Sequence, residues 1–263
     1  MPETIIQIKD LVAKYENRTV LNGINLDIFR GESITILGKS GCGKSTLLRH
    51  IIGLHTPASG QVLIKGHDMT TMDEDKKVEI LKKIGMLFQS SALFNSMTIG
   101  DNVALPLREH TELEESTIKI MTNMKLDMVG LAGFEGFKPS QLSGGMKKRA
   151  GLARSLAMDP EILFCDEPSA GLDPVVAAGI DNLILNLKKA FKMTIVIVTH
   201  EMASVEIIAD RVAMMHEGKI LAVGPLDELK SQNNPIINQF FNREPDKDEI
   251  DRERRMSTIM GTT

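Results

Sequence analysis

The chain contains no tryptophan, a single tyrosine and only two cysteines among its 263 residues. Neither Cys42 nor Cys165 lies in a CxxC motif or a Cys/His cluster, which argues against a metal site built on thiolates. Two cysteines in a chain of this length also argue against a disulfide scaffold, so we expect a reduced, intracellular setting.

Long hydrophobic runs and excess positive charge are lacking too. A membrane-spanning helix needs about 18–20 apolar residues, whereas Met193–Val198 and Ile34–Leu37 have only the length of strands. The opening residues, MPETIIQIKD, lack the basic region and apolar stretch of a signal peptide. The net charge of −4 argues against a generally basic nucleic-acid binder. We expect a cytoplasmic chain with no nucleic-acid partner, which associates with a membrane only through another protein.

Short apolar segments alternate with helical patterns, which predicts an α/β fold with a mainly parallel sheet covered on both faces. The strand Ser33–Gly38 precedes a helix expected over Lys44–Gly53, with Leu47, Leu48, Ile51 and Ile52 on its apolar face. Further strands are predicted at Ile84–Phe88, Ile162–Cys165 and Thr194–Val198.

Both ends of this core are predicted to hold antiparallel strands. Ile5–Tyr15 and Val20–Arg30 are β-rich, with a turn expected at Glu16–Thr19. Two strands, Arg211–His216 and Lys219–Val223, flank a hairpin turn at Glu217–Gly218.

A methionine-rich region of helical pattern interrupts the core. Within it, apolar residues recur every three to four positions at Ile118, Met121, Met124, Met128 and Val129. Such methionines either fill gaps in a core or form an adaptable docking surface. We expect a helical subdomain at about 97–158 inside a domain spanning 1–241. The charged segment 242–263 is expected to be a flexible tail or a helix that orders on a partner.

A glycine-rich phosphate-binding loop is the strongest motif. The pattern G-x-x-x-x-G-K-[ST] falls between a predicted strand and a predicted helix, as such a loop requires. Its nine residues are Gly38, Lys39, Ser40, Gly41, Cys42, Gly43, Lys44, Ser45 and Thr46. Backbone N–H groups and the helix N-terminus can surround an anion. Lys44 is expected to neutralise the β- and γ-phosphates, Ser45 to bind Mg²⁺, and Thr46 to reach the α-phosphate. We assign Cys42 no redox role.

Two adjacent acids follow the strand at Ile162–Cys165. Asp166 is expected at the carboxyl end of that strand, where parallel sheets bind ligands, and there to hold Mg²⁺ through its water shell. Glu167 points elsewhere and can polarise the attacking water as a general base. A lone Asp-Glu pair is more often a solvated turn, but the phosphate loop favours the functional interpretation.

A second glycine turn completes a resemblance to the ABC ATPase family, which covers about residues 6–224. Leu142-Ser143-Gly144-Gly145-Met146 matches the family's LSGGQ signature except at Met146. Ser143, Gly144 and Gly145 open a predicted helix and can bind an anion. The resemblance implies that they bind the γ-phosphate of ATP held by a second copy of the chain. Lys39 stands at a common proline position and leaves the loop backbone intact.

Four more positions match the family in order. Gln89 resembles the glutamine that contacts Mg²⁺ or water and senses the permease. Asp173 resembles the residue that crosses the dimer interface, and His200 the one that hydrogen-bonds the γ-phosphate. Tyr15 stands where an aromatic ring stacks on adenine. The resemblance implies an ATPase that uses Lys44, Gln89, Glu167 and His200 for catalysis.

One branch of the family resembles this chain closely at Leu87–Leu113. The segment LFQSSALFNSMTIGDNVALPLREHTEL is similar to ATPases of Mla/MCE-type phospholipid transporters. This resemblance implies an MlaE-like permease in the inner membrane, an MCE lipid-binding protein and, in some systems, a STAS-type subunit. The ATPase would lie on the cytoplasmic face of that membrane. We expect the permease to dock at Gln89–Phe94 and the neighbouring helices.

Three alternatives remain open from the sequence. The first is an ABC importer subunit for a polar solute such as an amino acid. The second is a soluble ABC-type ATPase of DNA repair or translation, although the long coiled coil or second cassette of those proteins is missing. The third is a P-loop kinase or GTPase, which would need no LSGG motif.

Overall fold

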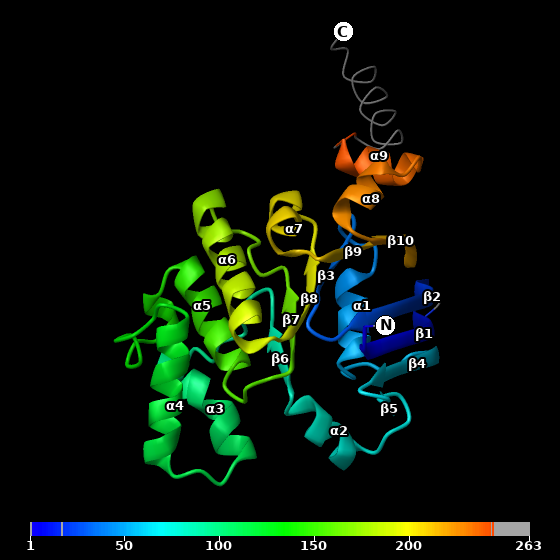
Figure 1. Cartoon of the computed structure of the whole chain (residues 1–263). Coiled ribbons are helices and arrows are strands. Elements are labelled where there is room, and N and C mark those ends of the chain that lie inside the picture. Colours follow the sequence, from blue (N-terminus) through cyan, green and yellow to red (C-terminus); the bar gives the residue numbers. More distant parts are fainter. Residues whose placement is uncertain (1, 17, 243, 245–263) are drawn as a thin grey trace.

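A mixed six-stranded sheet forms the centre of the computed structural model, which describes residues 2–16, 18–242 and 244 (Figure 1). Its order is β10-β9-β3-β8-β7-β6, and the strands are β3 (Ser33–Leu37), β6 (Ile84–Leu87), β7 (Ile162–Asp166), β8 (Thr194–Thr199), β9 (Arg211–His216) and β10 (Lys219–Gly224). The strands from β9 to β6 run parallel to one another, and β10 pairs antiparallel with β9. The predicted parallel sheet and terminal hairpin are confirmed.

Continuous apolar sequence explains the central position of three strands. Every residue of β3, β7 and β8 is buried, as expected for parallel strands covered on both faces. Because the carboxyl ends of parallel strands share one edge of the sheet, the residues after β3, β7 and β8 are brought together there.

A four-stranded antiparallel sheet packs beside this centre, in the order β2-β1-β4-β5. It contains β1 (Thr4–Tyr15), β2 (Arg18–Phe29), β4 (Ser59–Ile64) and β5 (His67–Asp68). The helix α1 (Lys44–Ile51) packs between the two sheets through Leu47, Leu48 and Ile51. The turn between β1 and β2 is tighter than predicted, because Tyr15 already pairs with Arg18.

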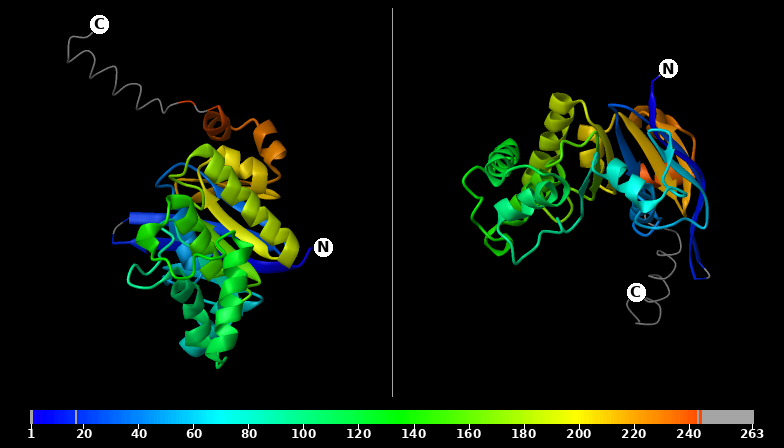
Figure 2. Two further views of the ribbon diagram at one scale, coloured as in Figure 1. Left: turned by 90° about the vertical axis from the view of Figure 1, so that its left-hand side faces the viewer. Right: turned by 90° about the horizontal axis from the view of Figure 1, so that it is seen from below.

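Helices cover the other face of the central sheet. These are α6 (Pro174–Phe191), α7 (Met202–Ile208) and α5 (Gly144–Ser155), whose apolar side chains pack with β7 and β8. A further pair, α3 (Ile99–His110) and α4 (Glu115–Met128), lies beside α5, and a 3-10 turn, η1 (Pro139–Gln141), precedes α5. Figures 1 and 2 show this helical region and the N-terminal sheet on opposite sides of the molecule.

Three short helices complete the described chain: α2 (Glu74–Leu81) before β6, then α8 (Leu226–Ser231) and α9 (Pro235–Phe241). Over residues 2–16, 18–242 and 244, none of the helices has both the length and the apolar character needed to cross a bilayer. Most of the predicted charged tail lies outside the described residues.

The methionine pattern of α4 was predicted only in part. Ile118 and Val129 are buried, and Met121 and Met128 are partly buried against the helical core. Met124, however, is 54% exposed and does not fill the core. The reason is geometric: Met124 lies six residues after Ile118, which places it about 120° around the helix from Ile118, at the edge of the buried face.

Candidate active site

The predicted phosphate loop connects β3 to α1 at the carboxyl edge of the central sheet (Figure 1). Gly43, with φ 107°, precedes the first turn of α1, a conformation that favours glycine. Gly38 lies against β9, and an added Cβ would sit 2.3 Å from the Met215 carbonyl oxygen. These two glycines are therefore required by backbone geometry. Ser40 and Gly41 are exposed at the tip of the loop, where a ligand can reach them.

Lys44 is the first residue of α1, and its side chain turns back over the loop. It is only 6% exposed. Its ammonium donates hydrogen bonds to the carbonyl oxygens of Gly38 at 2.8 Å and Lys39 at 3.1 Å. A positive charge is thus held within the cradle, close to the N-terminus of α1. Both features favour a bound phosphate.

Ser45 and Asp166 meet across the gap between α1 and β7. The Ser45 hydroxyl donates to Asp166 Oδ1 at 3.0 Å. Burial raises the pKa of Asp166, and this hydrogen bond partly offsets the rise. No group of three or more His, Cys, Asp or Glu in the described chain could hold a metal by itself. One hydroxyl and one carboxylate fit Mg²⁺, which usually keeps waters and takes further oxygens from phosphates.

Glu167 is buried beside this pair, and two neighbours hold its carboxylate. His200 Nδ1 lies 2.8 Å from Glu167 Oε1, and the Thr199 hydroxyl donates to Oε2 at 3.3 Å. The backbone of Glu167 is left-handed, with φ 49°, and its N–H donates to the Val198 carbonyl at 2.8 Å. The two carboxylates thus have different partners, Ser45 for Asp166 and His200 with Thr199 for Glu167. His200 follows β8 and is exposed, so it can contact both Glu167 and a ligand.

Lys148, on α5, is a further residue in this region that the sequence did not identify. It is 6% exposed, and its ammonium donates to the carbonyl oxygens of Gln89 at 2.7 Å and Glu167 at 2.9 Å. Burial lowers the pKa of Lys148, while the charges of Glu167 and Asp166 oppose that effect. The Gln89 side chain is exposed.

The signature motif lies apart from the phosphate loop. Ser143 caps α5, accepting a hydrogen bond from the Met146 N–H at 3.3 Å, and both Ser143 and Gly144 are exposed. An added Cβ on Gly145 would lie 2.6 Å from Val176, so the start of α5 packs closely on α6. Helices α5 and α1 contribute to cores on opposite sides of β7 and β8. Within one chain, Ser143 and Lys44 therefore belong to separate surfaces.

Two more predicted residues lie at the edges of the site. Asp173 caps α6, accepting from the N–H groups of Val175 and Val176 at 3.1 and 3.0 Å, and it is exposed. Tyr15 ends β1, is 43% exposed, and meets His55 edge to face with ring centroids 6.1 Å apart. Both are accessible to a ligand or a second chain.

Comparisons with known proteins agree with this arrangement. A family model described as ABC transporter matches residues 21–170. The intermembrane phospholipid transport ATP-binding protein MlaF of Haemophilus influenzae is 39% identical over 246 residues, which are 94% of this chain and 93% of that protein. The probable ribonucleotide transport ATP-binding protein mkl of Mycobacterium leprae is 41% identical over 237 residues, which are 90% of this chain and 68% of that protein.

A solved structure is similar as well. It is a dimeric ATP-binding cassette in a post-hydrolysis state with bound ADP and Pi. Its TM-score is 0.78 at 31% identity, with 84% of this chain and 98% of that chain covered. The phosphate loop, the paired acids and the signature turn thus occur in a fold shared with ATP-hydrolysing relatives. This chain belongs to the ABC transporter family, as a subunit that binds and hydrolyses ATP.

Proposed function

We propose that two copies of this chain sandwich ATP and drive a membrane permease that moves phospholipids. The observation that carries the paired arrangement is the separation of Ser143 from Lys44 within one chain. An exposed serine-glycine turn at a helix start is suited to an anion. A second copy can offer that turn to the phosphates on the first copy's loop. The dimeric cassette with ADP and Pi supports this pairing by similarity.

The residues then divide the work of hydrolysis. Lys44 and the loop N–H groups stabilise charge on the transferring phosphoryl group, and Ser143 with Gly144 and Gly145 does so from the second copy. Ser45 and Asp166, with Gln89, would hold Mg²⁺, which supplies further positive charge.

Glu167 orients the attacking water and accepts its proton. His200 contacts the γ-phosphate through Nε2 while its Nδ1 remains on Glu167, because the two ring nitrogens can bond different partners. Tyr15 stacks on adenine, and Asp173 faces the second copy. Closure of the dimer excludes bulk water and orients the reactants.

Phospholipid is the cargo that we favour. The MlaF relative covers nearly the whole chain, and the segment Leu87–Leu113 carries the subfamily pattern. The mkl relative, named for ribonucleotide transport, supports a nucleotide cargo instead. An importer of a polar solute such as an amino acid is the remaining transporter alternative.

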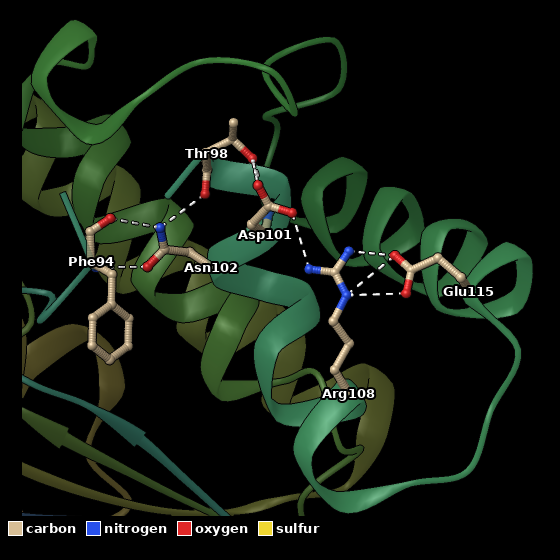
Figure 3. Close-up of polar contacts among 6 residues, drawn as sticks. All are labelled: Phe94, Thr98, Asp101, Asn102, Arg108 and Glu115. Atoms are coloured by element: carbon tan, nitrogen blue, oxygen red, sulfur yellow. Dashed lines mark hydrogen bonds and ion pairs between the residues drawn. The ribbon is translucent and has the colours of Figure 1, made fainter. Parts of the chain in front are cut away.

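A groove on the helical side is the proposed docking site for the permease. It has a volume of about 640 Å³ and lies between α2, the end of β6 and α3, with Val78, Phe88, Phe94 and Pro106 among its lining residues. Phe94 is 51% exposed there. Figure 3 shows the amide of Asn102 bonded to the backbone of Phe94, which fixes the residue at this surface. An MlaE-like permease, an MCE protein and a STAS-type subunit would complete the assembly at the cytoplasmic face of the inner membrane.

The test is to purify the native membrane complex through a tag on this chain. Mass spectrometry would identify the subunits and any bound lipid, and transport would be measured after reconstitution with labelled phospholipid, ribonucleotide or amino acid. We expect a polytopic permease, an MCE protein and ATP-dependent movement of phospholipid. Movement of ribonucleotide or amino acid without phospholipid would overturn the cargo assignment and leave the ATPase assignment intact.

A further inference from the structure

The ammonium of Lys148 joins two segments of the active site that are far apart in sequence. It donates to the carbonyl of Gln89, two residues after β6, and to the carbonyl of Glu167, the residue directly after β7. With 6% exposure, this charge is almost completely withdrawn from water. A buried ammonium is costly unless it is well hydrogen-bonded. The two carbonyls supply that compensation.

Helix α5 holds the loop after Gln89 at a second point. The guanidinium of Arg154 donates to the carbonyls of Ser91 at 2.9 Å and Ala92 at 2.8 Å. Ser91 and Ala92 are both left-handed, with φ 63° and 48°. An added Cβ at Gly151, between the two cations on α5, would lie 3.0 Å from Ser91 Cβ. The loop and α5 therefore form one tightly packed unit.

On the other side, Lys148 holds the peptide that carries the candidate base. The Glu167 N–H is bonded to Val198, and its carbonyl is bonded to Lys148. These two contacts fix a left-handed residue at both ends, and so fix the direction of its side chain toward His200. Without the ammonium, one of them is lost.

We propose that Lys148 is a positioning residue that fixes Glu167 against the loop beginning at Gln89, and thereby aligns the base for hydrolysis. The inference rests on the proposed role of Glu167. The ammonium of Lys148 bonds the backbone carbonyls of Gln89 and Glu167 and neither the phosphate loop nor the Gln89 side chain, so we expect its removal to affect ATP binding little. Removal of the ammonium should therefore lower kcat and leave KM for ATP nearly unchanged.

The experiment compares variants of the full chain in the native membrane complex. Lys148→Met keeps the length of the side chain and removes both the charge and the hydrogen bonds, whereas Lys148→Arg keeps both. Lys125→Met is the matched control, since Lys125 is a buried lysine that contacts Asp159 and the Phe191 ring far from the phosphate loop. Glu167→Gln is measured beside them. The readouts are kcat, KM for ATP and the melting temperature.

For Lys148→Met we expect kcat to fall about 10- to 100-fold, the range that a small misplacement of a catalytic group produces. KM should stay within about 2-fold, as for an interaction that acts only in the transition state. Lys148→Arg should restore most of the activity, and Lys125→Met should match the wild type. If Lys148→Met does not fold, Lys148→Gln replaces it.

Two results would overturn the inference. The first is a wild-type kcat in Lys148→Met. The second is a loss of kcat that Lys148→Arg shows as well and that is accompanied in both variants by a lower melting temperature. An active Glu167→Gln variant would instead overturn the role proposed for Glu167. An inactive Glu167→Gln beside a fully active Lys148→Met would refute the positioning role alone.

Discussion

The side-chain amide of Asn102 pairs with both backbone polar groups of Phe94. Its Oδ1 accepts from the Phe94 N–H at 2.8 Å, and its Nδ2 donates to the Phe94 carbonyl at 3.1 Å (Figure 3). Nδ2 also donates to the Thr98 carbonyl at 2.9 Å. Because Asn102 is fully buried on α3, a side chain inside the helical region holds a residue whose ring lies in the proposed docking groove.

Replacement of Asn102 by leucine should destabilise the chain strongly. The volume is similar, but the Phe94 N–H loses its partner, at about 1–3 kcal/mol if it is left buried. The Phe94 carbonyl loses one hydrogen bond and keeps the one from the Met97 N–H at 3.2 Å. Urea unfolding of the full chain measures the loss. Arg108→Met is the control: Arg108 bridges Asp101 and Glu115 on the surface of the same region, and exposed pairs contribute less than about 1 kcal/mol. Equal losses in the two variants would contradict this prediction.

Phe94→Ala should uncouple transport from hydrolysis. The ring contributes apolar surface to the groove and lies outside the phosphate loop, so basal ATPase activity should survive while transport falls. The same result is expected for Leu93→Ala. The measurements are the transport and ATPase rates of the reconstituted complex. Phe191→Ala is the control, since Phe191 is another exposed phenylalanine, 45% exposed at the end of α6. Intact transport in Phe94→Ala would remove this site from consideration.

Glu167→Gln should abolish turnover and preserve ATP binding. The amide keeps the size of the side chain but cannot accept the proton of the attacking water. ATP should then accumulate in the closed pair, which size-exclusion chromatography with bound-nucleotide analysis detects. Removal of the preorganised donor Ser143, as Ser143→Ala, should cost on the order of 10²–10³ in rate. Unaltered hydrolysis by Glu167→Gln would show that another group is the base.

Gly38→Ala should disrupt the phosphate loop through a backbone clash. The added methyl group would meet the Met215 carbonyl at 2.3 Å, so β3 and β9 must separate. Overpacking of this kind typically costs about 1–3 kcal/mol, and displacement of the loop should weaken nucleotide binding as well. Thermal unfolding and fluorescent-nucleotide titration provide the two measurements. Gly41→Ala separates the clash from backbone strain. Its added Cβ meets nothing within 4 Å, whereas its φ of 78° strains any residue other than glycine.

Asp181 should make stability depend on pH. It is 2% exposed on α6, and its Oδ1 has no partner among the described residues. Burial raises its pKa above the ordinary 3.8, with hydrogen bonds to Ser204 and Ser169 opposing the rise. The folded chain therefore holds this proton more tightly than the unfolded chain. The resulting stabilisation is complete below the unfolded pKa and is lost as pH rises through the folded pKa.

Asp181→Asn removes this dependence, so the variant should gain stability relative to the wild type as pH rises from acid to neutral. Urea unfolding at several pH values measures the difference. A difference that stays constant across the same pH range would contradict the assignment.

The sequence predicted those parts of the protein in which a local pattern determines the conformation. The strand before Gly38, the helix from Lys44 and the hairpin at Glu217–Gly218 all follow from short-range spacing. Ser45 and Asp166 were expected at one site because both follow parallel strands, and the 3.0 Å contact agrees. The catalytic roles proposed for the site residues remain predictions.

Lys148 could not be identified in this way, because α5 buries residues around most of its circumference. Gly145, Lys148, Ala150, Gly151, Leu152 and Ala153 are all buried, so periodicity does not single out one face. A lysine in such a sequence is expected to reach solvent. Only the positions of Gln89 and Glu167 in space show where the ammonium is held. The docking groove likewise combines segments from about residue 78 to residue 158, which no local pattern relates.

The left-handed backbone of Glu167 places a cost in folding stability on the residue proposed as the catalytic base. A residue with a Cβ held at φ 49° costs on the order of 1 kcal/mol relative to a relaxed conformation, and glycine would relieve that strain. That substitution would also remove the buried carboxylate that contacts His200 and Thr199, and with it the base proposed above. Engineering of this chain for durability should hold that position fixed.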